Sequence, residues 1–158
     1  MALIEAIELT KVYGKGDTAV TALDHVNLRI ERGEFVAVMG PSGCGKSTLL
    51  HLLGGLDRPT SGGVKIDGQS LSDLNDTALA ELRRRRIGFV FQFFNLIPVL
   101  DAVENAALPL MLDGAPLAEA RTRAGEWLER VDMSSRKTHR PDQLSGGQQQ
   151  RVAVARAL

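Results

Sequence analysis

The most restrictive feature of this sequence is the stretch of residues 40–48, which reads G-P-S-G-C-G-K-S-T. It fits the pattern G-x-x-x-x-G-K-[ST], whose glycines allow the backbone to wrap around a phosphate chain. The apolar run 35–39 before it predicts a buried parallel strand, and leucines at helical spacing after it predict a helix that ends near Gly54. Strand, glycine loop and helix therefore follow in the order that phosphate binding needs.

Each fixed position of this stretch predicts a role. Backbone N–H groups of the loop and the N-terminus of the following helix are expected to hold phosphates. We expect Lys46 to reach the β- and γ-phosphates, and the Ser47 hydroxyl to take one position on a Mg²⁺ ion that bridges them. The alternative is a glycine-rich turn that binds nothing, and the complete motif in its context favours the nucleotide site.

The bulk properties are typical of a small intracellular protein. The 158 residues are enough for one domain, and 19 Lys and Arg balance 19 Asp and Glu, so net charge gives no argument for a nucleic-acid partner. The N-terminus does not resemble a signal peptide, and no apolar run approaches the roughly 18 residues of a membrane span. The single Cys44 cannot form an intramolecular disulfide, which fits a reducing cytosol.

The basic run 83–86 has two readings. It closes a helix predicted from Asp76, where cations complement the helix dipole, and it also fits a nucleic-acid contact. The first reading is the commoner one for such a run.

Apolar patterns before and after the glycine loop predict further strands. Segments 3–9 and 20–30, joined by a polar turn at 13–17, predict a small antiparallel sheet, and 64–68 predicts another short strand. Tyr13, the only tyrosine, either stacks on a flat base or is an ordinary turn aromatic. Residues 87–91 predict a second core strand, which would place Gln92 at its C-terminal end, facing a ligand crevice.

Local signals also define three later helices. Asp101 with Glu104 predicts a capping box, and Pro109 is expected to limit or kink the helix that follows. Pro116 is expected to be the first residue of another helix. Ser145 predicts the N-cap of a last helix, in which the glycines at 146 and 147 leave N–H groups open to an anion.

The glycine loop, Gln92 and the pentapeptide L-S-G-G-Q at 144–148, in this order, resemble the ATP-binding subunit of an ABC transporter. The resemblance covers residues 3–158. It implies an α/β fold with a P-loop NTPase core, a small N-terminal antiparallel β subdomain and a helical subdomain. The implied division is 1–34 for the β part, 35–92 for the P-loop core part, 93–144 for the helical subdomain and 145–158 for the signature helix.

The resemblance also implies the cofactors ATP and Mg²⁺ and a role for each matching residue. Tyr13 corresponds to the aromatic that stacks on adenine, and Gln92 to the residue that touches Mg²⁺ and the attacking water. The signature 145–148 corresponds to the segment that closes on the γ-phosphate of ATP held by the opposite subunit of a head-to-tail dimer. The implied catalytic residues are Lys46 and Gln92, the metal ligands are Ser47 and Gln92, and the nucleotide contacts are Tyr13, Gly40, Pro41, Ser42, Gly43, Cys44, Gly45, Lys46, Ser47 and Thr48 with Ser145, Gly146, Gly147 and Gln148 in trans.

The segment 91–98, with 104–105 and 108–110, is similar to the branch that serves lipoprotein release, macrolide or peptide export and cell division. This likeness implies a protein on the inner face of the cell membrane. It would work through an integral-membrane permease that docks after Gln92, with no nucleic-acid partner. Two alternatives are a non-transport ABC ATPase that acts on nucleic acid or the ribosome through 83–86, and a nucleotide-binding regulator without catalysis.

The likeness to the family stops at Leu158, inside the helix after the signature. Family members continue into a strand with an acidic Mg²⁺ ligand and the catalytic glutamate, and then to a switch histidine. All three histidines of this sequence precede the signature. We therefore expect a partial sequence of a longer protein that lacks later core strands, is poorly soluble or molten alone, and does not hydrolyse ATP alone.

Overall fold

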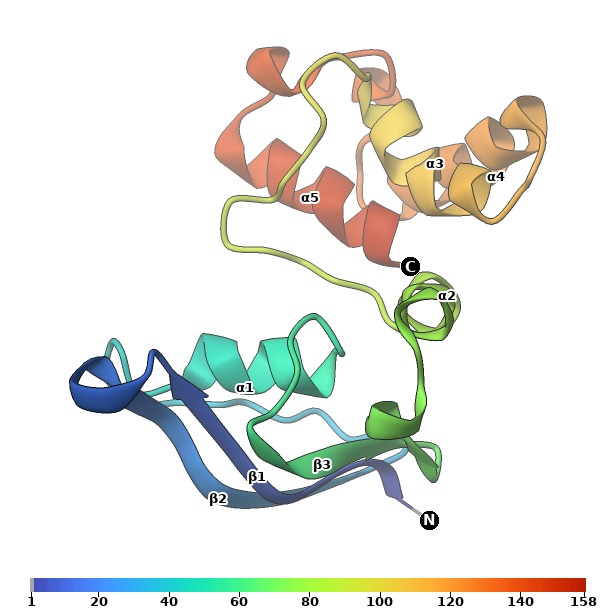
Figure 1. Cartoon of the computed structure of the whole chain (residues 1–158). Coiled ribbons are helices and arrows are strands. Elements are labelled where there is room, and N and C mark those ends of the chain that lie inside the picture. The colour runs from blue at the N-terminus through green and yellow to red at the C-terminus, as the bar shows by residue number, and fades with distance from the viewer. Residues whose placement is uncertain (1) are drawn as a thin grey trace. The chain divides into compact units, whose positions relative to one another are not determined.

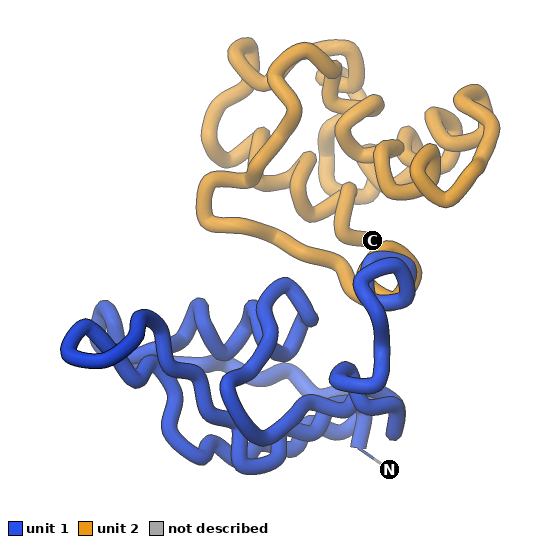
Figure 2. The backbone as a smooth tube through the Cα atoms, viewed as in Figure 1, with its two compact units in different colours: residues 1–81 blue, residues 82–158 orange. Residues whose placement is uncertain are grey.

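A computed structural model describes residues 2–158 of the chain. The chain forms two compact units, residues 1–81 and 82–158, which Figure 2 shows in different colours. Helix α2 (Asp76–Arg86) contains the point at which one unit passes into the other.

Unit 1 is an antiparallel sheet with one helix on it. The strands are β1 (Ala2–Tyr13), β2 (Val20–Glu31), β3 (Ser61–Ile66) and β4 (Gln69–Ser70), in the spatial order β2-β1-β3-β4. Helix α1 (Lys46–Leu53) lies along this sheet (Figure 1), and it buries Leu49, Leu52 and Leu53. The predicted antiparallel sheet is confirmed, and β3 and β4 extend it beyond the first two strands. Short 3-10 turns occur at Gly16–Thr18 and Leu71–Asp73.

Unit 2 is helical. It contains α3 (Ala102–Leu112), α4 (Leu117–Arg130) and α5 (Gly146–Ala157), with 3-10 turns at Ser134–Arg136 and Pro141–Gln143. The three helices share one core, because each turns a stripe of alanines and larger apolar residues toward the others. Leu128, Met133 and Val152 are fully buried in it.

The helix-start signals are confirmed. Asp101 and Glu104 form the predicted capping box of α3, with the Glu104 N–H donating to Asp101 Oδ1 at 2.8 Å, and Pro109 lies inside this helix. Ser145 is the N-cap of α5. Pro116 differs slightly from the prediction, since it is the residue before α4 and not its first residue.

Two predicted strands are wrong. Residues 35–39 and 87–91 form no strand, because within residues 2–158 neither segment lies beside a strand that pairs its N–H and C=O groups. The apolar side chains of 35–39 are accordingly open, with Phe35 at 96% and Met39 at 88% exposure, whereas Ile87, Phe89 and Phe91 are partly buried. A buried parallel strand needs neighbours on both edges, and local apolarity alone does not supply them.

The basic run at the end of α2 has partners inside the helical unit. Arg84 Nε and Arg85 Nε lie 2.8 and 3.0 Å from Asp113 Oδ1. Hydrogen bonding from Arg85 is the main cause that lowers the pKa of the Asp113 carboxyl. This part of the run therefore ties α2 to the C-terminal end of α3. No helix among residues 2–158 is both long and apolar enough to span a bilayer.

Candidate functional site

The loop 40–45 enters α1 through glycines in the left-handed region. Gly43 has φ 80° and Gly45 has φ 91°, values that a residue with a side chain rarely adopts. A Cβ atom at Gly45 would also lie 2.4 Å from the carbonyl oxygen of Ala22 in β2. Backbone conformation and close packing on β2 therefore both require glycine at position 45.

Lys46, the first residue of α1, folds back over this loop. Its Nζ donates to the carbonyl oxygens of Gly40 at 2.9 Å and Pro41 at 2.7 Å, and it lies 3.7 Å from Cys44 Sγ. The ammonium group is thus held at the loop by weak, exchangeable partners. An anion that entered the loop would compete with these neutral carbonyls and form a stronger, charge-assisted contact.

The N-terminus of α1 adds further donors on the same side. The bond from Leu49 N–H to the Gly45 carbonyl, at 2.8 Å, is the one that closes the first turn of the helix. N–H groups earlier in an α-helix have no partner four residues back, and they point toward the preceding loop. Backbone donors, a helix dipole and the Lys46 charge therefore face the same loop, an arrangement that suits a chain of phosphates.

Tyr13 is the last residue of β1, and its ring is held in place by two side chains. The hydroxyl donates to Asp57 Oδ2 at 2.9 Å, and Lys11 Nζ lies 4.9 Å from the ring centroid. Lys11 also pairs with Asp57 Oδ1 at 2.8 Å, and this bond is the main cause that lowers the pKa of the Asp57 carboxyl. Tyr13 is 43% exposed, so a fixed aromatic residue faces solvent in unit 1.

Lys11 and Asp57 were not among the site residues predicted from the sequence. The signal for Lys11 was available, because residues two apart on a strand share a face of the sheet and Lys11 precedes Tyr13 by two. Asp57 gave no such signal, since it lies 44 residues from Tyr13.

Gln92 lies in unit 2, on a turn and not at the end of a strand. The Phe94 N–H donates to the Phe91 carbonyl at 3.0 Å, which closes a turn with Gln92 as its second residue. Gln92 is exposed.

The pentapeptide at the start of α5 is also in unit 2. Ser145 Oγ accepts from the Gln148 N–H at 3.3 Å, and the Ser145 N–H donates to Gln148 Oε1 at 2.9 Å. Gly146 and Gly147 are exposed, and a Cβ atom at either position would meet nothing within 4 Å among the residues that the structure describes. No contact within the described chain therefore requires these two glycines.

The structure gathers the predicted residues into two groups. Tyr13 belongs to unit 1 together with the loop 40–48, whereas Gln92 and 145–148 belong to unit 2. The two predicted Mg²⁺ ligands, Ser47 and Gln92, are thus divided between the units. Within residues 2–158, no cluster of three or more His, Cys, Asp or Glu side chains is placed to hold a metal ion.

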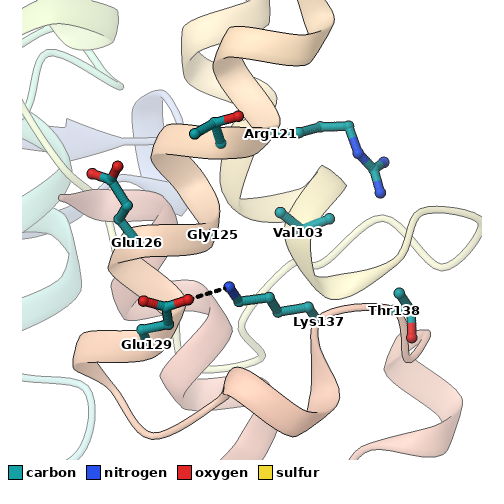
Figure 3. A pocket seen from close by; sticks show the side chains of 8 residues that line it. Val103, Arg121, Gly125, Glu126, Glu129, Lys137 and Thr138 are labelled. Carbon is teal, nitrogen blue, oxygen red and sulfur yellow. Dashed lines mark hydrogen bonds and ion pairs between the residues drawn. The ribbon is translucent and has the colours of Figure 1, made fainter.

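A shallow hollow on unit 2 contains none of the predicted site residues. Figure 3 shows its side chains, with Glu129 of α4 joined to Lys137 at 2.7 Å. Arg121, also on its wall, pairs with Glu104 at 2.8 Å. These two ion pairs neutralise the charges of Arg121, Glu129 and Lys137, so the three side chains give the hollow no preference for an ion.

Comparison with known proteins agrees with the geometry of the loop. The profile of the family "ABC transporter" matches residues 23–158. The chain is 53% identical over 156 residues to an uncharacterized ABC transporter ATP-binding protein of Thermotoga maritima, covering 99% of this chain and 67% of that protein. It is 50% identical to the lipoprotein-releasing system ATP-binding protein LolD of Geobacter metallireducens, with 99% and 70% coverage.

A longer relative and a solved structure give the same result. The macrolide export ATP-binding/permease protein MacB of Hyphomonas neptunium is 54% identical over 156 residues, which are 99% of this chain and 24% of that protein. The dimeric ATP-binding cassette MJ0796, solved in a post-hydrolysis state with ADP and Pi, superimposes with a TM-score of 0.91 at 50% identity, covering 98% of this chain and 68% of that one. The chain therefore belongs to the ABC transporter family and is similar to its LolD and MacB ATP-binding proteins.

Proposed function

We propose that the loop 40–48 binds the phosphates of ATP, and that the chain acts as the ATP-binding subunit of a transporter. The observation that carries this proposal is the position of Lys46, whose ammonium rests on the carbonyls of Gly40 and Pro41 beside the first turn of α1. Its charge and the backbone donors together suit the β- and γ-phosphates. Tyr13 would stack on the adenine, because its ring is exposed and already fixed by Asp57.

We place the Mg²⁺ ion at Ser47, with Gln92 as a second contact. Ser47 is exposed in the first turn of α1, and Mg²⁺ in such sites takes few protein ligands beside phosphate oxygens and water. When bound, Mg²⁺ neutralises charge on the outer phosphate oxygens. Gln92 would orient the attacking water.

The partners that we propose are a second ATP-binding subunit and an integral-membrane permease. The relative MJ0796 was solved as a dimer, which supports pairing of two subunits. We propose that the pair is head-to-tail, with two ATP molecules at its interface. The segment after Gln92 exposes Phe93 at 80% and Val99 at 72%, an apolar surface that suits a membrane protein docking there. ATP hydrolysis would then drive export or remodelling on the periplasmic side, from the inner face of the membrane.

Alkylation of Cys44 tests the nucleotide site directly. Cys44 is the only cysteine, is exposed, and lies inside the loop, so a maleimide reacts at one defined place. We expect the modified protein to lose binding of a fluorescent ATP analogue and bound ATP to slow the modification, because the adduct fills the space of the phosphates. Cys44→Ser is the control, which should bind nucleotide with or without the reagent. Normal nucleotide binding by fully modified protein would overturn the proposed site.

Gly147→Ala tests the role of the signature. Since a Cβ atom at position 147 meets nothing within 4 Å among residues 2–158, the substitution should stabilise α5 by up to about 1 kcal/mol. The same methyl group would obstruct the close approach of a nucleotide held by a second subunit. We expect the thermal unfolding temperature to rise slightly, while ATP-dependent dimerisation of the subunit, measured by light scattering, is lost. Unimpaired dimerisation would show that the signature does not lie at the dimer interface.

A further inference from the structure

The turn that carries Gln92 continues into a backbone conformation that needs outside support. Phe94, the last residue of the turn, and Asn95, which follows it, have φ values of 59° and 47°. The left-handed region is uncommon for residues other than glycine and is a real outlier for a bulky side chain such as that of Phe94. Residues in such conformations persist only where their surroundings fix them.

Arg156, near the C-terminal end of α5, supplies the support. Its Nη2 donates to the Phe94 carbonyl and its Nη1 to the Asn95 carbonyl, both at 2.6 Å. The planar guanidinium presents donors in a fixed fork, so one side chain holds two consecutive carbonyls. Arg156 is half-buried, and this burial lowers the pKa of its guanidinium. Arginine nevertheless stays charged at neutral pH, and its hydrogen bonds are of the stronger, charge-assisted kind.

A second contact joins the same end of α5 to the chain before Gln92. Gly88 packs so closely on the last turn of α5 that a Cβ atom there would lie 2.0 Å from the carbonyl oxygen of Ala157. The C-terminal end of α5 therefore touches the chain on both sides of Gln92, and Figure 1 shows this segment running from α2 past α5 to α3.

We propose that Arg156 is a positioning residue for Gln92 and ties the turn 91–94 to the signature helix. α5 is a single helix from Gly146 to Ala157, about 18 Å long at 1.5 Å per residue. It carries the signature at one end and Arg156 near the other. A displacement of 145–148 is then carried along the helix to the turn that holds Gln92. The inference rests on the proposed role of Gln92, and all the contacts that carry it lie within unit 2.

Amide hydrogen exchange of the ¹⁵N-labelled 158-residue chain, read residue by residue by NMR, tests this proposal. In Arg156→Met we expect the turn to be released. The Phe94 and Asn95 backbone amides should then exchange faster by about tenfold or more, and the side-chain amide signals of Gln92 should change as well. The Ile97 amide should keep its rate, because it donates to Asn105 Oδ1 at 2.7 Å and not to a group that Arg156 touches. Arg156→Lys, which keeps the charge but not the fork, should fall between the two.

Arg151→Met is the matched control. Arg151 lies on the same helix and also donates to a backbone carbonyl, that of Val131, at 2.8 Å. It should leave the Gln92 signals and the Phe94 amide unchanged. If Arg156→Met raises exchange uniformly across α3, α4 and α5, or leaves Phe94 protected, Arg156 has only a general structural role and the proposal fails.

Nucleotide titration of the same proteins separates this inference from the proposed function. In Mg²⁺-free buffer, Arg156→Met should bind a fluorescent ATP analogue as the unaltered chain does, because the proposed phosphate donors of the loop 40–48 belong to unit 1 and only the Mg²⁺ contact involves Gln92. Failure of the unaltered chain to bind would count against the nucleotide site. The exchange pattern would still decide whether Arg156 holds the turn.

Discussion

Lys46→Ala is expected to weaken binding of ATP about 100-fold, the largest effect of any single substitution at the loop. Hydrogen bonds to charged groups contribute about 1.5–3 kcal/mol each, and the ammonium would make at least one to the β- or γ-phosphate. Unlike a backbone N–H, the ammonium also carries a full positive charge, so the loss should exceed what any backbone donor of the loop contributes alone. Titration with a fluorescent ATP analogue measures the dissociation constant directly.

The structure also indicates how Lys46→Ala should affect the stability of the fold. Without nucleotide, Lys46 donates to the Gly40 and Pro41 carbonyls, and both residues are exposed. Water replaces the lost donors at an exposed carbonyl, so Lys46→Ala should change the free energy of unfolding by less than about 1 kcal/mol. A large loss of binding with a small loss of stability would identify the phosphate contact as the cause.

Two variants complete the experiment. Lys65→Ala removes one positive charge from β3 of the same unit and should leave the dissociation constant unchanged. Lys46→Arg keeps the charge but replaces a compact ammonium with a wider fork, so it should recover only part of the affinity. If Lys46→Ala binds ATP within twofold of the unaltered chain, the loop is not the phosphate site.

Local sequence signals predicted the helices correctly. The two strands were predicted wrongly because a strand depends on pairing with a distant segment. The Asp101 and Ser145 caps were predictable because each bond joins residues three apart. Residues 35–39 and 87–91 have the composition of strands, but a strand also requires a second strand to pair with. That partner is a distant segment, which local composition does not identify. Apolarity therefore predicted strands at two segments that have no pairing partner among residues 2–158.

The same distinction applies to the candidate site. The loop 40–48 is a contiguous motif, so its glycines and Lys46 could be assigned from sequence alone. The support of Tyr13 by Asp57 and of Asn95 by Arg156 spans 44 and 61 residues, and no periodicity predicts such pairs. Asn105 did leave a signal: a polar residue stands among Val103, Ala106 and Ala107 on the buried part of α3. Its use becomes clear only from the structure.

Asn105→Ala should be the most destabilising substitution in unit 2, at about 3 kcal/mol or more. Asn105 is fully buried, and its Oδ1 accepts from the Ile97 N–H at 2.7 Å. Its Nδ2 donates to the carbonyls of Ile97, Leu100 and Asp101 at 3.0 to 3.1 Å. One amide thus satisfies the backbone of the segment that leads into α3. Alanine would leave these groups without their partner and open a cavity, and each buried unsatisfied group costs about 1–3 kcal/mol.

Urea unfolding followed by the fluorescence of Trp127 measures this loss in the helical unit. Trp127 is the only tryptophan and packs against the core of α3, α4 and α5. Thr122→Ala is the control in the same unit, because its exposed hydroxyl makes one bond to the Ala118 carbonyl, and it should change stability by less than about 0.5 kcal/mol. Equal midpoints for Asn105→Ala and Thr122→Ala would show that water replaces the amide.

Asn105→Asp adds a pH dependence whose sign follows from the same contacts. A carboxylate has no donor for the three carbonyls, so the folded state would favour the protonated acid and raise its pKa above the unfolded value of about 3.9. Between these two values the unfolded chain binds fewer protons than the folded one, and stability therefore falls as pH rises. Relative to the unaltered chain, the variant should be least destabilised below about pH 4 and lose stability progressively toward neutral pH. A pH-independent difference would mean that the carboxylate reaches solvent, contrary to the complete burial of Asn105.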